Sequence, residues 1–273
     1  MIKERIQGFL RRMGAYDRMR ETLAYDIYRH WKHGYPVGWR ENERRLFASL
    51  LRPLGTNPLV FDIGANRGQR TEVFLRLGAR VIAVEPDPLN QRLLTRRFSR
   101  RRLGTAQVTV VGKAVSSAIS VATLWIHRPG SGLNSLNQKW VESLGECADR
   151  FGTKVAFEGS RQVETTTLDA LIGEFGVPGY IKVDVEGHEL AVFQGLGRKV
   201  PFLSFEVNLP EMFGDSLECL ELLGRLSPSG RFNWFVDFSR DFSLPQWMTL
   251  AEFAPMLRGC REKTIEVFWR SEG

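Results

Sequence analysis

The run VFDIGANRGQRT at residues 60–71 places an acid, Asp62, just before a turn that holds Gly64 and Gly68. In a parallel α/β fold, such a turn after the first strand lets backbone N–H groups approach a nucleotide closely. The pyrophosphate of a dinucleotide would meet the carboxylate of Asp62, which is unfavourable. S-adenosylmethionine carries an ammonium and a sulfonium, so Asp62 favours that cofactor over NAD. A helix N-cap is the alternative role for Asp62.

A second acid ends the next apolar run, RVIAV at residues 80–84. Glu85 follows Gly64 by about 20 residues, the spacing at which an acid holds the ribose diol of an adenosine cofactor. NAD and S-adenosylmethionine both contain that ribose, so Glu85 predicts a nucleoside site without choosing between them. A solvated acid at a strand end is the alternative.

The run YIKVDVEGHE at residues 180–189 brings a base, acids and a histidine to the end of another apolar strand. Asp184 is expected at the carboxyl tip of that strand, where ligand sites of α/β folds form. A hydroxyl acceptor needs a base that takes its proton. His188 or Asp184 is the predicted general base, with Lys182 tuning the carboxylate. For His188, a helix-capping or surface role is equally open.

Glu206 and Asn208 on the neighbouring strand SFEVN allow a second interpretation of the site, in which it binds a metal ion. Asp184, Glu206 and Asn208 would then form an oxygen-rich magnesium site that lowers the pKa of the acceptor. We favour the general base, with no metal, because this spacing of magnesium ligands over two strands is a loose pattern. Glu206 is then expected to contact the acceptor.

A polar loop, PGSGLNSLN at residues 129–137, follows an alternating run, VATLWIHR, that could extend the edge of the sheet. Its length and chemistry suit a mobile lid beside a ligand. Asn134, Ser135 and Asn137 are the candidates for hydrogen bonds to the acceptor. An ordinary polar turn is the alternative.

The elements that must position these residues alternate between strand and helix from residue 59 onward. This βαβ pattern predicts an α/β fold with a parallel sheet. Two final strands, one of them antiparallel, would complete a Rossmann-like sheet of seven strands with flanking helices. The predicted division is a basic helical extension at residues 1–57 and a cofactor-binding domain at residues 58–273.

The composition indicates a globular protein of 273 residues with a net charge of +7. Residues 1–57 hold 12 Lys and Arg against 6 Asp and Glu, so most of the excess charge lies there. Their apolar stripe, Ile2, Ile6, Phe9, Leu10 and Met13, is expected to pack on the protein, with peripheral membrane contact as the alternative. The scattered cysteines and the lack of a signal peptide or membrane span favour the cytoplasm.

The motifs named above also fall in a fixed order along the chain: DIGANRGQRT, VEPDP, GLNSL, VETTTLDAL, IKVDVEGHELAVFQG and SFEVN. This ordered set resembles the FkbM-type family of S-adenosylmethionine-dependent methyltransferases over roughly residues 59–210. The resemblance implies a class I methyltransferase sheet. It also implies O-methylation of a hydroxyl on a sugar, a glycolipid or a natural product.

The resemblance further implies the residues that bind the cofactor. The methionine end falls to Asp62, Gly64, Asn66 and Gly68, with Ala65 in the same turn. The ribose falls to Glu85, and the adenine region to Asp87, Lys113 and Ala114. The family signature matches at Asp184, Glu186 and Gly187. His188 departs from the small or variable residue found there, so the resemblance gives it no catalytic role.

Two other functions are weighed against methyl transfer. An NAD(P)-linked oxidoreductase is disfavoured by Asp62 and by the missing third glycine of GxGxxG. A non-catalytic adaptor could dock through the basic extension and through Arg92–Arg102, but Asp62 and Glu85 argue for a working cofactor site. The expected partner is a small molecule or glycan that carries a hydroxyl, with no nucleic acid. The sequence makes no prediction of oligomeric state.

Overall fold

A computed structural model describes residue 31 and residues 39–99, 107–146, 150–152, 154–236 and 241–272. The predicted apolar stripe at the N-terminus lies outside these residues. One compact unit comprises Met1–Phe47 with Phe238–Asp241, and the other comprises Ala48–Asp237 with Phe242–Gly273. The candidate site belongs entirely to the second unit.

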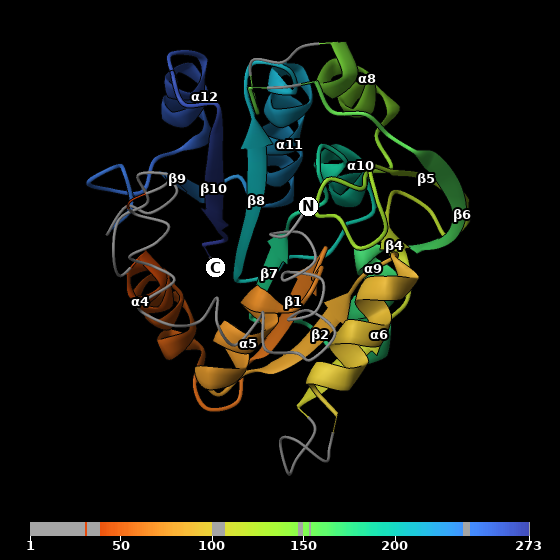
Figure 1. Cartoon of the computed structure of the whole chain (residues 1–273). Coiled ribbons are helices and arrows are strands. Elements are labelled where there is room, and N and C mark those ends of the chain that lie inside the picture. The colour runs from red at the N-terminus through yellow and green to blue at the C-terminus, as the bar shows by residue number, and fades with distance from the viewer. Residues whose placement is uncertain are drawn as a thin grey trace. The chain divides into compact units, whose positions relative to one another are not determined.

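The central element of the second unit is a seven-stranded sheet with the order β3-β2-β1-β7-β8-β10-β9 (Figure 1). In that order the strands are β3 (Val108–Val111), β2 (Arg80–Val84), β1 (Leu59–Ile63), β7 (Tyr180–Val183), β8 (Phe202–Asn208), β10 (Thr264–Arg270) and β9 (Arg231–Phe235). Neighbours from β3 to β8 are parallel, and β10 is antiparallel to both β8 and β9. The predicted α/β fold with one antiparallel closing strand is confirmed.

Helices follow the strands as the alternating pattern predicts. They are α4 (Trp39–Leu51), α5 (Gln69–Arg76), α6 (Pro88–Arg97), α8 (Gln138–Glu146), α9 (Leu168–Phe175), α10 (Glu189–Gln194), α11 (Phe213–Leu226) and α12 (Leu250–Arg258), with a short 3-10 helix η1 (Arg52–Leu54) after α4. Side chains of α9, α10, α11 and α12 form one buried core with the apolar face of the central strands. Strands covered on both faces read as continuous apolar runs, which is why LVFDI and YIKV could be recognised.

A second, three-stranded sheet has the order β4-β6-β5. It contains β4 (Ala114–Val115), β6 (Gly159–Thr166) and β5 (Val121–Ile126), and β5 is antiparallel to β6. The expectation that VATLWIHR extends the edge of the main sheet is therefore wrong. Alternation reports a half-buried strand but not the sheet to which it belongs. Helix α8, directly after the polar loop, was not expected either.

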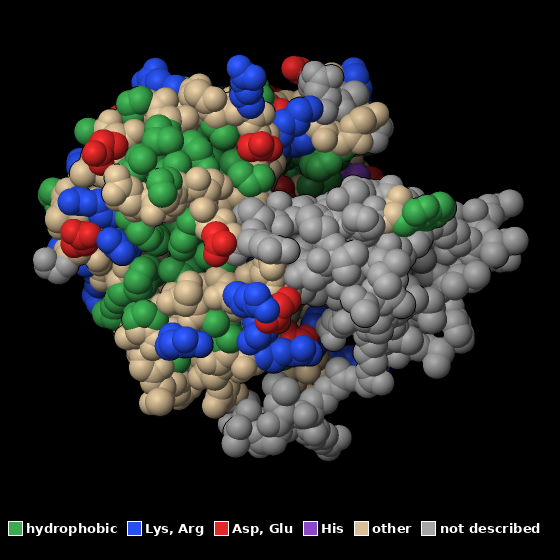
Figure 2. Space-filling view, turned by 90° about the vertical axis from the view of Figure 1, so that its left-hand side faces the viewer, with side chains coloured by type: hydrophobic (Ala, Val, Ile, Leu, Met, Phe, Trp, Pro, Cys, Tyr) green, Lys and Arg blue, Asp and Glu red, His purple; other side chains and the backbone are tan. Residues whose placement is uncertain are grey.

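The surface drawn in Figure 2 carries basic and acidic side chains interspersed around apolar areas. Within the described part of the chain, no helix has the length and apolar character needed to cross a membrane.

Candidate active site

The glycine turn at residues 64–68 follows β1 and lies next to the carboxyl ends of β2 and β7. Gly64 and Gly68 have positive φ angles of 80° and 77°, and Asn66 has φ 48°. The N–H groups of Gly64 and Ala65 both donate to the carbonyl oxygen of Val84 at 3.0 Å, which joins the turn to β2. A side chain at Gly64 would place Cβ 1.8 Å from the backbone oxygen of the residue that follows β7. The backbone can make this close approach only with glycine.

A pocket opens at the carboxyl ends of β1, β2 and β7, the location expected for ligands of α/β folds. It holds about 680 Å³ of space between atoms, with open solvent at its mouth included. Half of the predicted site residues line it: Gly64, Asn66, Glu85, Lys113, Ala114, Asn134, Asp184 and His188. Apolar lining comes from Val115, Leu124 and Leu136.

Asp62 lies under the turn and does not line the pocket. Its side chain is buried and accepts a hydrogen bond from Thr71 Oγ1 at 2.5 Å. Burial raises the pKa of this carboxyl, although the bond from Thr71 opposes the shift. The contact shown therefore ties β1 to α5, and a direct contact of Asp62 with a cofactor stays a prediction.

Glu85 joins two backbone segments at the pocket wall. Its carboxyl accepts hydrogen bonds from the N–H groups of Asn66 at 2.8 Å and Asp87 at 2.7 Å. Burial raises the pKa of Glu85 to about 7, and both bonds oppose that shift. Asn66 Oδ1 is buried and has no hydrogen-bond partner among the described residues. Buried polar atoms are normally satisfied, so this oxygen offers an acceptor to a bound ligand.

Asp87 is the anchor of the polar loop on the side of α6. Its side chain caps α6 by accepting from Leu89 N at 2.7 Å. Its other oxygen accepts from Gly130 N and from Asn134 Nδ2, both at 2.9 Å. Asp87 thus holds the loop next to the pocket. Its predicted contact with adenine stays a prediction.

The far end of the loop is anchored to the turn before α10. Ser135 Oγ donates to the carbonyl oxygen of Glu186 at 2.6 Å, and Asn137 Nδ2 donates to that of Gly187. Asn137 Oδ1 accepts from the N–H of Trp140 at 3.3 Å. These side chains connect the two rims of the pocket, and their predicted bonds to an acceptor stay a prediction.

Lys182 is a buried cation on β7 between two carboxylates. Its Nζ lies 3.1 Å from Asp184 Oδ2 and 3.7 Å from Glu266 Oε1, and its side chain is 3% exposed. Burial alone would lower its pKa, but the two carboxylates outweigh burial and raise it. Lys182 is therefore cationic at neutral pH and fixes one oxygen of Asp184. Glu266, on the last strand, gave no sequence signal because no motif surrounds it.

Three glutamates beside Asp184 have raised pKa values. Burial is the main cause, and neighbouring carboxylates add to it. The pKa of Glu189 rises to about 7 and that of Glu206 to about 8, while that of Glu186 lies well above its usual value. Glu189 and Glu206 can therefore hold or release a proton near neutral pH.

His188 occupies the N-cap position of α10 without a capping hydrogen bond from its side chain, and it lines the pocket. Its Nε2 lies 3.0 Å from Ser116 Oγ. Burial lowers the pKa of His188 to about 4, so the ring is neutral at physiological pH. Burial disfavours the protonated ring, which makes His188 a weak proton acceptor.

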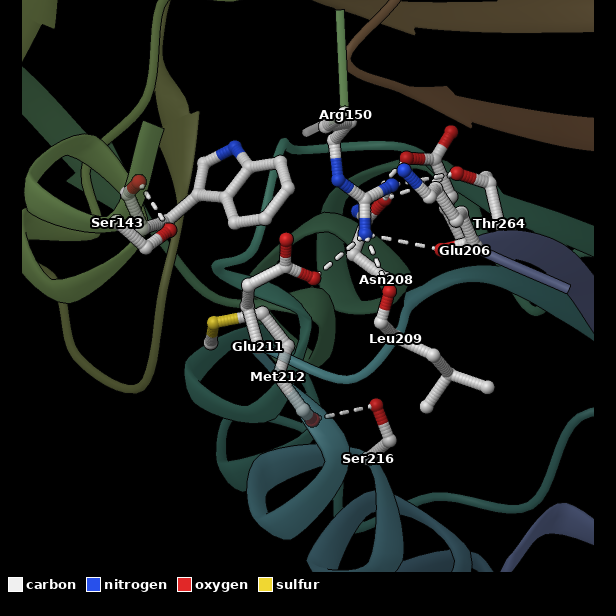
Figure 3. A network of polar contacts seen from close by, with 11 residues as sticks. Ser143, Arg150, Glu206, Asn208, Leu209, Glu211, Met212, Ser216 and Thr264 are labelled. Atoms are coloured by element: carbon white, nitrogen blue, oxygen red, sulfur yellow. Dashed lines mark hydrogen bonds and ion pairs between the residues drawn. The ribbon is translucent and has the colours of Figure 1, made fainter. Parts of the chain in front are cut away.

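Arg150 connects the ends of β8 and β10 and gave no signal in the sequence (Figure 3). Its guanidinium donates to Asn208 Oδ1 at 2.9 Å and to Thr264 Oγ1 at 2.7 Å. The alternative magnesium site needs that same Asn208 oxygen. Across the part of the chain that the structure describes, no group of three or more His, Cys, Asp or Glu side chains is placed to hold a metal.

The raised pKa values predict how stability depends on pH. Folded Glu189 keeps its proton to about pH 7, whereas in the unfolded chain it loses the proton near its usual pKa of 4.5. Between those values the folded state binds more protons, so the free energy of unfolding falls as pH rises. We expect Glu189→Gln to remove more than about 1 kcal/mol of that decline between about pH 5 and about pH 8.

Urea unfolding of both proteins across that range measures the effect. His188, with its lowered pKa, acts in the opposite direction in both proteins and cancels in the comparison. Parallel stability curves for the wild type and Glu189→Gln would contradict the assignment of a raised pKa.

The strand order, the antiparallel β10 and the pocket at the carboxyl ends of β1, β2 and β7 define the architecture of a class I methyltransferase. The sequence model of the methyltransferase FkbM domain matches residues 62–227, which is more than half of the chain. The chain therefore belongs to the FkbM methyltransferase family, and the predicted family is confirmed.

One relative is the hexuronic acid methyltransferase AglP of Haloferax volcanii, which is 29% identical over 175 residues. The match covers 62% of this chain and 64% of AglP. Precorrin-6y C5,15-methyltransferase from Geobacter metallireducens GS-15 aligns with a TM-score of 0.38 and 12% identity, over 84% of this chain and 87% of that one. The C-terminal domain of the Rhodobacter capsulatus enzyme of that name gives 0.42 and 12%, over 85% and 88%.

Proposed function

We propose that the protein transfers a methyl group from S-adenosylmethionine to a hydroxyl of a sugar, a glycolipid or another hydroxylated metabolite. The observation that carries the proposal is that Glu85, Asn66 with its unpartnered oxygen, and Asp184 line one pocket. Family membership supports the methyl transfer. The similarity to AglP, a hexuronic acid methyltransferase, supports a sugar as the acceptor.

The cofactor would lie along the β1 and β2 side of the pocket. Gly64 and Asn66 would hold its methionine end, and the Glu85 carboxyl would accept hydrogen bonds from the ribose hydroxyls. Ala114, Val115 and Leu124 provide an apolar wall for the adenine ring. The bound cofactor supplies an electrophilic methyl carbon attached to a sulfonium.

Asp184 would take the proton of the acceptor hydroxyl. Its side chain is about one third exposed, which leaves it open to a substrate, while Lys182 fixes one of its oxygens. The acceptor oxygen forms the new bond to carbon as the carbon–sulfur bond breaks, and its proton passes to the Asp184 carboxylate. An in-line displacement depends on alignment, which a fixed carboxylate provides. Glu206 does not line the pocket, but its carboxyl interacts with that of Asp184, and we place it on the side where the acceptor would bind.

A direct assay separates this function from the two alternatives. We expect the full chain to bind S-adenosylhomocysteine in calorimetry and to bind NAD and NADP far more weakly. We also expect it to methylate one member of a panel of sugars, glycolipids and small hydroxylated metabolites, with the same rate in EDTA as in magnesium. No binding of S-adenosylhomocysteine at millimolar ligand would contradict the proposal and favour an adaptor.

A further inference from the structure

Arg150 is a buried guanidinium whose partners are almost all uncharged. Besides Asn208 and Thr264, it donates to the carbonyl oxygens of Leu209 at 2.8 Å and Lys263 at 2.9 Å. Among the described residues it forms an ion pair with Glu211 at 2.7 Å, and the Arg150 side chain is 5% exposed. Burying a charge is costly unless it is well paired. The hydrogen bonds from the guanidinium therefore offset the cost of burying Arg150 and fix its side chain against the ends of β8 and β10.

These contacts fix the orientation of the Asn208 amide. Its Oδ1 accepts from Arg150 and also from Thr264 Oγ1 at 3.3 Å. Its Nδ2 must then point the other way, and it donates to Glu206 Oε1 at 2.8 Å. An amide rotated by half a turn would present its oxygen to the Glu206 carboxyl instead. Figure 3 shows Arg150, Asn208 and Glu206 in this sequence of contacts.

Glu206 lies near both negatively and positively charged side chains. Asp184, Glu186 and Glu189 follow β7, Lys182 lies on β7, and Glu266 is its partner in register on β10. Burial and the neighbouring carboxylates favour the protonated form of Glu206, whereas the Asn208 donor and Lys182 favour the ionised form. Loss of one hydrogen bond to the ionised form would raise the pKa of Glu206.

We infer that Arg150 is a positioning residue that acts through the Asn208 amide and holds the Glu206 carboxyl in place beside Asp184. The inference rests on the proposed function, because that function places Glu206 on the acceptor side. It assigns a role in the site to a residue that contacts neither the pocket nor Asp184. Arg150 sets which end of the Asn208 amide faces Glu206, and it thereby influences the protonation of the Glu206 carboxyl.

The test is an NMR titration of the glutamate side-chain carboxyl carbons in the full chain, with Glu206 assigned by the signal missing from Glu206→Gln. We expect Arg150→Met and Asn208→Leu each to raise the Glu206 midpoint by about one pH unit, the size expected for one hydrogen bond to a charged group. We expect the double variant to shift no further than either single one, because both remove the same contact.

Glu211→Gln is the matched control, since it removes only the ion pair of Arg150 and should leave the midpoint unchanged. If Arg150→Met does not fold by circular dichroism, Arg150→Lys takes its place; one ammonium cannot reproduce the donor fork of the guanidinium, so a smaller upward shift of the midpoint is still expected. An unshifted midpoint, or a double variant that shifts by the sum of both, would overturn the inference. The NMR titration needs no methyl acceptor, so it tests the role of Arg150 separately from the proposed function. Failure of the proposed function would show instead as a lack of S-adenosylhomocysteine binding.

Discussion

Asp184→Asn is expected to lower kcat for methyl transfer by roughly 10²–10⁴-fold, the contribution typical of a general base. Asparagine keeps the shape of the side chain but cannot accept the proton. The contact with Lys182 persists through the amide oxygen, so the backbone of the pocket should keep its conformation. We therefore expect the affinity for S-adenosylhomocysteine to remain within about threefold of the wild type, well under 1 kcal/mol.

The measurement pairs initial rates at saturating cofactor with calorimetric titration of S-adenosylhomocysteine. Asp215→Asn provides the same substitution at the surface, where Asp215 pairs with Lys139 at 3.2 Å, and should leave both quantities unchanged. Full activity of Asp184→Asn would exclude Asp184 as the base and leave Glu206, whose pKa is raised to about 8, as the candidate carboxyl.

The contacts of Asp184 and Glu189 explain why Asp184 suits the role of general base better than Glu189. Glu189 accepts hydrogen bonds from the N–H groups of Val185 at 3.1 Å and Gly187 at 3.4 Å, so its carboxyl supports the turn. Asp184 is instead held by a side chain and remains partly exposed. A cation that is itself buried and paired restrains the carboxylate at a defined position.

The sequence could predict the main sheet because its strands are buried on both faces. LVFDI, RVIAV and YIKV are continuous apolar runs, and the acid or lysine within them did not hide the pattern. The small sheet could not be placed, since the pairing of β5 with β6 joins segments that no local pattern relates. Sequence periodicity reports which face of a strand is buried, not which strand lies next to it.

The sequence could predict those residues of the candidate site whose motifs lie at the carboxyl ends of strands. Residues after β1, β2 and β7 meet because the carboxyl ends of parallel strands lie at one edge of the sheet. Arg150 and Glu266 could not be found in this way. The bond from Arg150 to Asn208 spans 58 residues, and neither Arg150 nor Glu266 stands in a recognisable motif. Their roles follow only from contacts made in the folded chain.

Gly64→Ala has the largest expected effect on the cofactor site. The φ angle of Gly64 is 80°, and an added Cβ would lie 1.8 Å from the backbone oxygen and 2.8 Å from the carbonyl carbon of Asp184. Backbone atoms cannot move aside as the end of a flexible side chain can. The turn or the end of β7 must shift, which would separate the cofactor wall from the proposed base.

We expect Gly64→Ala to reduce the affinity for S-adenosylhomocysteine by at least about 100-fold, or about 2.7 kcal/mol, and the free energy of unfolding by about 3 kcal/mol or more. Gly78→Ala isolates the backbone term, because Gly78 has φ 86° but no atom within 4 Å of the added Cβ. That control should cost only about 1–2 kcal/mol in stability and leave binding unchanged. Equal losses in both variants would mean that the approach of β7 to Gly64 does not shape the pocket.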